Sequence, residues 1–465
     1  MPVAPHVIQR QVLRLRLAPG ADGRAVQQRA EAALHSRPLL DALDAALSAA
    51  ARPADWLTLD RLELDLGRVD SARLEAQLLD RLPALLRREV AEAWATARSG
   101  TGPPEAAVLQ SAPDTAWAAW LHFLRTGALP AAWPAPAAAA AWETEILALL
   151  GGASENQRAG LRAALASAPM RQRLVRQFSG ALAVAVLAAL DAAARPHQPA
   201  LAEALGPLLR RLGSYSGVLG EQLLMELLRQ VATEKHALRW PALLAVLAPE
   251  KRLARPDVLA QLARAALLAV GAAAPRGPGP KLPDAAAASE AAKAPDPAAF
   301  VANAGVVLLH PFLAPCFAAR GWLADDRFTD ETAQAKAVLL VHFLATGASQ
   351  AAEYELRLPR LLCGVPAGAV SSRRLRLGRT ARAEGLALLT AALGHWEALK
   401  NTSPEGLREA FLQREGKLER TPDGHHLLTV EQRAQDVLLD HLPYGWGLGV
   451  VQLPWMPARL AIHWA

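Results

Sequence analysis

Proline and glycine recur at short intervals through an alanine- and leucine-rich sequence between about residues 112 and 271. Leucines at three- and four-residue spacing are typical of the buried face of a helix, and Ala and Leu are strong helix formers. Proline interrupts a helix interior because it lacks an N–H donor and clashes with the preceding turn. The pattern therefore predicts a series of short, packed helices. The expected breaks are Gly151–Gly152, Pro169, Pro196, Pro207, Pro241, Pro249 and Pro256.

The composition excludes several classes of protein. The 465 residues are 52% hydrophobic and 20% charged, so the chain is too apolar to remain disordered. Its two cysteines, Cys316 and Cys363, are too few for a disulfide scaffold, and their apolar neighbours predict buried structural thiols. The net charge is +6, but arginines alternate with acidic residues, and no basic run is interleaved with aromatics. We therefore do not expect a nucleic acid partner.

No segment is predicted to span a membrane. A spanning helix needs roughly 18 apolar residues, and the run Ala181–Leu190 is about half that length before Asp191 ends it. The first residues, MPVAPHVIQRQ, lack the apolar region of a signal peptide. These observations predict a soluble protein that is made in the cytoplasm.

The first 100 residues predict a β-α-β-α module. Gln11–Leu17 alternates leucine with arginine, and Trp56–Gly67 alternates leucine with polar residues, as half-buried strands do. Helices are expected from about Ala25 to Ala50 and after Asp70, whose side chain can cap a helix start. Two parallel strands joined by a crossover helix would bury the apolar faces together.

Three further regions follow this module. Residues 101–270 form the alanine- and leucine-rich helical region. Residues 271–297 contain six prolines among alanines and are predicted to be a linker, because such a sequence cannot build a core. Residues 298–465 are predicted to form a C-terminal α+β domain with a hairpin and a tryptophan-rich end.

Local signals in the C-terminal domain predict both helices and strands. Helices are expected over Val301–Phe317 and Asp330–Thr346, and Ser403-Pro404-Glu405 is typical of a helix start. Pro422-Asp423-Gly424 predicts a β-hairpin turn. The expected strands are Lys417–Thr421, His426–Val430, Gly447–Leu453 and Arg459–Trp464. The predicted fold class is therefore mainly α, with small β-sheets near the N- and C-termini.

Two short segments resemble each other. Leu121–Gly127 reads LHFLRTG and Val341–Gly347 reads VHFLATG, and each predicts a helix that ends at glycine. A single sequence does not distinguish whether this similarity arose by chance or by internal duplication.

The chain lacks the common catalytic motifs. It contains no phosphate-binding glycine loop, no dinucleotide-binding fingerprint and no H-E-x-x-H pair. His425-His426 is interpreted as part of a surface turn, since no other ligand cluster matches it by spacing. Asp60, Glu63 and Asp65 alternate with leucines and are interpreted as the solvated face of a strand. We therefore predict no catalytic residue, no metal site, no cofactor and no enzymatic activity.

Tryptophan is the most informative residue type near the C-terminus. Of 12 tryptophans, three lie in the last twenty residues beside predicted turns. They either fill a small core or form a docking surface, because tryptophan is enriched in both settings. The candidate interaction surface consists of Trp446, Trp455, Met456, Trp464 and Tyr444.

Several motifs together resemble one known family. The N-terminal pieces are Ile8–Leu17 and Leu59–Gly67. The C-terminal pieces are Asn303–Leu313 (NAGVVLLHPFL), Glu353–Leu356 (EYEL), Leu361–Pro366 (LLCGVP), Leu399–Ser403 (LKNTS), Leu407–Leu412 (LREAFL), Leu442–Trp446 (LPYGW) and Leu453–Met456 (LPWM). These pieces resemble the tape measure proteins of extracellular contractile injection systems, phage-tail-like particles of the antifeeding-prophage type. The resemblance covers roughly the first 100 and last 165 residues.

The resemblance implies a structural role in assembling the particle and no catalytic residues. It implies a protein that sets tube and sheath length or that anchors tube assembly at the baseplate. The expected partners are tube, baseplate or spike-hub proteins, and a homo-oligomer is compatible with the symmetric particle. The protein would be cytoplasmic during assembly and then lie in the tube lumen. A helical adaptor or chaperone-like assembly factor outside the particle is the alternative.

Overall fold

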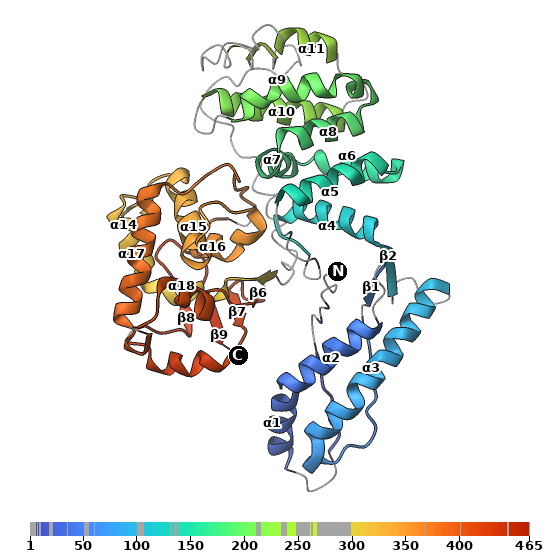
Figure 1. Ribbon diagram of the computed structural model, residues 1–465, viewed down its shortest axis with the longest axis vertical. Helices are drawn as coiled ribbons and strands as arrows, with labels where there is room; N and C mark the ends of the chain where they lie inside the picture. The colour runs from blue at the N-terminus through green and yellow to red at the C-terminus, as the bar shows by residue number, and fades with distance from the viewer. Residues whose placement is uncertain are drawn as a thin grey trace. The chain divides into compact units, whose positions relative to one another are not determined.

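The chain forms two compact units in a computed structural model. The first consists of Met1–Ala119 with Ala132–Ala135, and the second of Trp120–Ala131 with Pro136–Ala465. Helices dominate both units, which confirms the mainly α fold class (Figure 1). The residues that the structure describes are 6, 8, 11–17, 22–34, 36–50, 55–59, 61–99, 107–130, 133, 136, 139–210, 215–233, 240–247, 261, 264–266, 299–366, 368–399, 401–443 and 446–464. The predicted linker, residues 271–297, lies outside them.

The described helices of the first unit include α1 (Gly23–Leu34), α2 (Arg37–Ala50) and α3 (Leu74–Ser99). Helix α2 packs along α3, and leucines at helical spacing form the core between them. The Asp70 side chain accepts a hydrogen bond from the Ala72 backbone N–H, as expected for a cap before α3. The core residues include Leu39, Leu43, Ala46, Leu78, Leu82, Leu86, Val90 and Trp94.

The predicted parallel strand pair is wrong. Gln11–Leu17 forms no strand, and β1 (Asp55–Leu59) pairs antiparallel with β2 (Ala107–Ser111), which lies beyond α3. The alternating leucines Leu62 and Leu64 instead pack, half-buried, against the helical core as extended chain outside any sheet. Packing on a helix buries alternate side chains as a sheet would, so the sequence pattern alone did not identify the partner.

The second unit begins with a helical region that contains α4 (Ala112–Thr126), whose last turns belong to this unit. The helices that follow are α5 (Ala139–Gly152), α6 (Glu155–Leu165), α7 (Ala168–Gln177), α8 (Gly180–Leu190), α9 (Gln198–Arg210), α10 (Tyr215–Thr233) and α11 (Trp240–Leu247). Helix α8 is buried on almost every face because it packs against α5, α9 and α10 (Figure 1). The helices are short, as the sequence predicts, but the expected break at Pro207 is wrong because α9 continues through it, and Pro249 and Pro256 lie outside the described residues.

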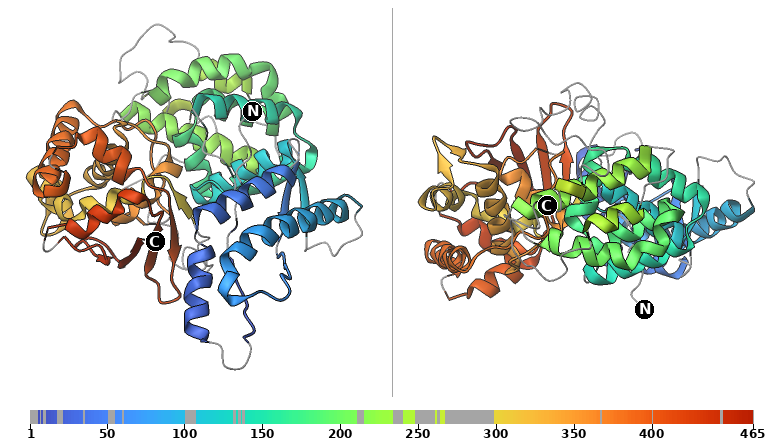
Figure 2. Two further views of the ribbon diagram at one scale, coloured as in Figure 1. Left: turned by 60° about the horizontal axis from the view of Figure 1, so that its bottom comes forward. Right: turned by 90° about the horizontal axis from the view of Figure 1, so that it is seen from above.

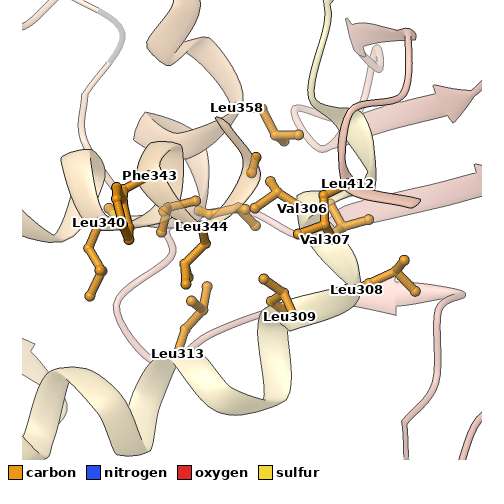
Figure 3. Close-up of a cluster of buried hydrophobic side chains, with 14 of the residues drawn as sticks. Val306, Val307, Leu308, Leu309, Leu313, Leu340, Phe343, Leu344, Leu358 and Leu412 are labelled. Atoms are coloured by element: carbon orange, nitrogen blue, oxygen red, sulfur yellow. The ribbon is translucent and has the colours of Figure 1, made fainter. Parts of the chain in front are cut away.

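The same unit contains the C-terminal residues, which form one continuous hydrophobic core. Its helices are α14 (His310–Ala319), α15 (Glu331–Thr346), α16 (Arg357–Leu362), α17 (Arg379–His395) and α18 (Pro404–Leu407). Figure 3 shows the centre of this core, where Val306, Leu309 and Leu313 meet Leu340 and Leu344. Ser403 caps α18 by accepting from the Gly406 N–H, as the sequence indicates.

A five-stranded sheet completes the C-terminal part, in the order β3-β6-β7-β9-β8. Its strands are β3 (Ala299–Val301), β6 (Gly416–Arg420), β7 (His426–Val430), β8 (Val450–Val451) and β9 (Leu460–Trp464) (Figure 2). The β6–β7 hairpin turns at Gly424, which has a φ of +86°. Strand β9 pairs parallel to β7, whereas the other pairs are antiparallel. A separate two-stranded ribbon pairs β4 (Leu323–Ala324) with β5 (Arg327–Phe328).

The predicted helix Val301–Phe317 is wrong in its first half. Strand β3 occupies Ala299–Val301, and a 3₁₀-helix, Ala304–Leu309, precedes α14. The Ala304 N–H donates to the Arg414 carbonyl, which holds this segment beside β6 instead of in a helix. Tertiary packing buries this apolar run on more than one side. A buried helix has a similar apolar sequence, so the sequence pattern did not distinguish the two.

Candidate interaction sites

The candidate tryptophans lie mainly in the hydrophobic core. Trp446 is only 7% exposed and Met456 only 4%, whereas Trp455 and Trp464 are half-buried against the same core. Trp446 packs edge-on against Phe312, with ring centroids 5.0 Å apart. Tyr444 lies outside the described residues. Most of this candidate surface therefore contributes to stability, and its use in docking stays a prediction.

Each indole N–H of the three tryptophans has a partner within the chain. Trp446 donates to the Leu308 carbonyl, and Trp455 donates to the Leu362 carbonyl at 2.8 Å. Trp464 donates to a carboxylate oxygen of Asp436 at 2.9 Å. These bonds fix the rings in place, because a buried indole N–H without a partner is costly.

An open hollow of about 440 Å³ lies beside Trp446 and Trp464. Its lining includes Asp436, which is 8% exposed and which also accepts a hydrogen bond from the Arg433 backbone N–H at 2.7 Å. The Arg414 guanidinium binds both oxygens of that carboxylate, and the Arg414 side chain is fully buried. The Asp436 carboxylate is thus engaged by internal donors and holds the wall of the hollow together.

A second cluster of buried charges joins the helical region to the C-terminal part within the second unit. The Glu353 side chain is 0% exposed, and its carboxylate lies between the guanidinium groups of Arg173 and Arg360. Arg173 contacts the two carboxylate oxygens at 3.2 Å each, and Arg360 contacts one at 2.7 Å. The Glu353 backbone N–H donates to the Gln177 side chain at 2.9 Å.

Arg173 also holds the end of α4. Its Nη1 donates to the carbonyls of Leu124 and Arg125, at 2.6 and 3.1 Å. Gly127 follows with a φ of +76°, and a Cβ on this glycine would lie 2.5 Å from Glu353 Oε1. Glycine is therefore required here for both its backbone conformation and the close approach of the carboxylate. Two guanidinium groups, one carboxylate and a helix end therefore share one buried site.

Burial changes the pKa of groups around this cluster. Desolvation lowers the pKa of Arg360, and the Glu353 carboxylate partly offsets this effect. The Tyr354 hydroxyl has its pKa raised to about 12, mainly by burial. Its ring packs edge-on against Phe123 and Trp142, with centroids 6.0 and 5.9 Å apart. The neutral tyrosine and the charge cluster therefore form one continuous contact between the two parts.

Further ion pairs surround the buried cluster. Glu221 of α10 contacts Arg176 at 3.2 Å and Arg374 at 3.3 Å. The Gln177 side-chain amide donates to the Ser371 carbonyl at 2.7 Å, and Arg374 donates to the Val175 carbonyl at 3.0 Å. The loop before α17 is thus hydrogen-bonded along α7, which makes the contact extensive and specific.

In the sequence, Glu353 stands out only as part of the EYEL motif, and no local pattern predicts a role for Arg173. The available signal was the Leu121–Gly127 segment, whose glycine marks the helix end that Arg173 binds. The partner carboxylate lies 180 residues from Arg173 along the chain, so no local pattern could connect them.

Chemically reactive arrangements are scarce in the part of the chain that the structure describes. No group of three or more His, Cys, Asp or Glu side chains there could hold a metal ion. Burial raises the pKa of the Cys363 thiol, which keeps it protonated, and Cys316 is half-buried and also unpaired. No described helix has both the length and the apolar character to cross a membrane.

A family model of contractile injection system tape measure proteins matches residues 5–464. The chain belongs to this family. The match extends through the helical region, which the sequence resemblance had left out. No significant match was found among curated proteins or solved structures. The family consists of structural proteins of the injection particle and is not an enzyme family, so the contacts described above are best understood as parts of an assembly protein.

Proposed function

We propose that this chain anchors tube assembly at the baseplate of a contractile injection system and does not act as a stretched ruler. The expected partners are tube, baseplate or spike-hub proteins. The chain would join them in the cytoplasm and stay at one end of the tube lumen. The observation that supports this proposal is the Arg173–Glu353–Arg360 cluster, which ties the helical region to the C-terminal part.

A ruler must be extended for its residue number to encode length. An α-helix rises about 1.5 Å per residue, so the 26-residue helix α3 spans about 39 Å, and the other described helices are shorter. Helices α5 to α10 pack on one another and bury their leucines. Stretching them into a tape would expose this core to solvent.

The buried cluster adds a further cost to extension. Separating the helical region from the C-terminal part would take Glu353 away from the Arg173 guanidinium, which is 2% exposed, whereas Arg360 lies in the same part as Glu353 and would stay with it. Both charges regain hydration when the two parts separate, so this cost is smaller than the roughly 3–5 kcal/mol of removing one partner of a buried pair by mutation. A folded anchor retains these interactions, and an extended tape loses them.

The test is the length of particles assembled with altered chains. One variant lacks thirteen residues of the 271–297 segment, and a second carries a helical insertion of the same length between α10 and α11. A ruler would lengthen the tube by about 20 Å with the helical insertion, at about 1.5 Å per residue, and would shorten it with the deletion. The anchor proposal predicts unchanged tube length by electron microscopy, with fewer particles when anchoring is impaired. A length change that follows the residue number would overturn it.

The alternative is an adaptor that assists assembly from outside the particle. Mass spectrometry of purified particles separates the two. The anchor remains in the particle at a fixed ratio to baseplate proteins, whereas an adaptor is required for assembly but absent from the product.

A further inference from the structure

Helices α4 and α15 end in the same way. Thr126 and Thr346 each bond back to the histidine carbonyl four residues earlier, at 2.9 and 2.8 Å. Gly127 and Gly347 follow in left-handed conformation, with φ of +76° and +74°. Each glycine N–H donates to a phenylalanine carbonyl, at 2.7 and 2.8 Å. The similarity of the two segments is thus a repeated structure.

An arginine holds the last carbonyls at both ends. At α15, Arg408 donates to the carbonyls of Leu344 and Phe343, at 3.0 and 3.2 Å. Both arginines follow a proline by four residues, since Pro169 precedes Arg173 and Pro404 precedes Arg408. Each proline lies in the first turn of its helix. We call Gly127 with Arg173 the α4 site, and Gly347 with Arg408 the α15 site.

The two sites differ in the carboxylate that they hold. At the α4 site, Glu353 comes from the C-terminal part, binds through both oxygens and is 0% exposed. At the α15 site, the acid on Arg408 is Glu405, which lies three residues earlier in the chain and is 68% exposed. Its Oε1 is 2.5 Å from Arg408 Nη1, the same nitrogen that lies 3.4 Å from where a Gly347 Cβ would be.

The surface above Gly347 is open where the α4 site is filled. A Cβ on Gly127 would meet the Glu353 carboxylate first, whereas a Cβ on Gly347 would meet only the Arg408 guanidinium within 4.0 Å. Gly347 and Ala348 are exposed to solvent. Arg408 is itself buried, with a side chain only 7% exposed, so the α15 site is reached at its Nη1, where the exposed Glu405 lies.

The residues after each glycine reach back to an earlier region of the chain, and one of them, Glu353, shows how such a site is filled. Trp133 lies six residues after Gly127, and Glu353 lies six residues after Gly347. Trp133 stacks on Trp56 within the first unit, with centroids 5.6 Å apart, and Glu353 occupies the α4 site. The segment after each repeat thus docks onto a region that precedes it in the chain.

We infer that the α15 site binds the glutamate of a partner protein, presented at the start of a short helix beside an aromatic residue, as Glu353 and Tyr354 are. The partner carboxylate replaces Glu405 on Arg408 and lies above Gly347. Nε and Nη2 of Arg408 donate to the Leu344 and Phe343 carbonyls, so the partner carboxylate binds at Nη1 through a charge-assisted hydrogen bond. The inference is independent of whether the chain anchors or measures the tube.

A peptide with the sequence of residues 349–358, SQAAEYELRL, is the probe. Its fluorescence anisotropy is measured with the full chain, with Glu405→Gln and with Glu405→Lys. Removing an exposed competing ion pair should tighten binding to Glu405→Gln about threefold. The Lys variant should bind at least about fivefold more weakly than the unchanged chain, because its ammonium repels Arg408. Glu405 is exposed, so neither change should alter the circular dichroism spectrum.

A control peptide carries Gln at the position of Glu353 and should lose most of the affinity. Equal affinity for the two Glu405 variants would overturn the inference, because binding elsewhere, including at the α4 site, does not depend on Glu405. Absence of saturable binding to Glu405→Gln at millimolar peptide would also overturn it. Self-association of the full chain that Glu405→Lys abolishes would assign the site to a second copy instead of a partner protein.

Discussion

Helices α4 and α15 end in similar sequences with the same backbone conformation, and each end is bound by an arginine. They differ in where the acidic partner of that arginine lies in the chain. At α4 the acid arrives from a distant part of the chain and is fully buried. At α15 the acid is local and mostly exposed. The comparison teaches that the same helix end can be a permanent internal joint or an accessible surface, depending only on what covers the glycine.

The largest expected difference concerns the two acids. Replacing Glu353 with Ala leaves Arg173 and Arg360 buried without their carboxylate, which should cost about 3–5 kcal/mol in the free energy of unfolding. The matched change Glu405→Ala removes an exposed pair and should cost less than about 1 kcal/mol. Urea unfolding followed by circular dichroism measures both, and similar losses would remove the distinction between joint and surface.

The glycines should also differ. Alanine at Gly347 has to adopt a positive φ, which costs about 1–2 kcal/mol. Alanine at Gly127 has the same cost and in addition displaces the Glu353 carboxylate 2.5 Å away, which adds about 1–3 kcal/mol. Thermal unfolding of the two variants tests this order. A larger loss of stability for Gly347→Ala than for Gly127→Ala would contradict the assignment of Gly127 as the covered glycine and Gly347 as the open one.

The buried histidine of α15 makes stability depend on pH. Burial lowers the pKa of His342 to about 4, below the value of about 6.5 in an unfolded chain. The folded state favours the neutral ring, so its contribution is complete above pH 6.5 and is lost as the pH falls from 6.5 towards 4. Between pH 7 and pH 5 this amounts to about 2 kcal/mol.

His342→Leu should flatten that part of the pH profile of the free energy of unfolding. The counterpart in α4, His122, has its pKa lowered by burial and by Arg125 and Arg357, so His122→Leu should act in the same direction. A profile that His342→Leu leaves unchanged between pH 7 and pH 5 would contradict the effect of burial.

The smallest effect should be the same at both helix ends. Thr126 and Thr346 each donate to a carbonyl one turn earlier and accept from the N–H two residues later, at 3.1 Å in both cases. Valine is similar in shape and removes these bonds, so each change should cost about 1 kcal/mol. Chemical denaturation should give equal values, and a large difference would show that the two helix ends are not equivalent.

Short-range features of the fold were predictable from the sequence. The Ser403 cap, the β6–β7 hairpin and the glycine ends of α4 and α15 all depend on residues within a few positions of each other. Their chemistry is local, since caps and turns use the side chain or the backbone freedom of one residue. The repeated helix ends were visible in the sequence, but the arginine that binds the carbonyls at each end was not.

Long-range features were not predictable for a physical reason. Three features depend on contacts between residues that are far apart in the sequence. They are the parallel pairing of β9 with β7, the 3₁₀-helix before α14 and the Arg173–Glu353 contact. A glutamate is usually solvated, so the burial of Glu353 could be recognised only once Arg173 and Arg360 were placed around it. The tryptophans had two interpretations, and their burial could be decided only by seeing that Trp446 reaches Leu308.

The order of strands in the C-terminal sheet has a consequence for how the chain folds during synthesis. Strand β9 lies between β7 and β8, so it occupies an interior position although Leu460–Trp464 is synthesised after the other four strands of this sheet. Until then β7 has an unpaired edge, β8 has no neighbour, and Asp436 lacks its Trp464 donor. The hairpin β6–β7 must therefore wait, with one edge open to other chains, for the last strand to arrive. Closure of this sheet is a late event, and premature association at that edge competes with it.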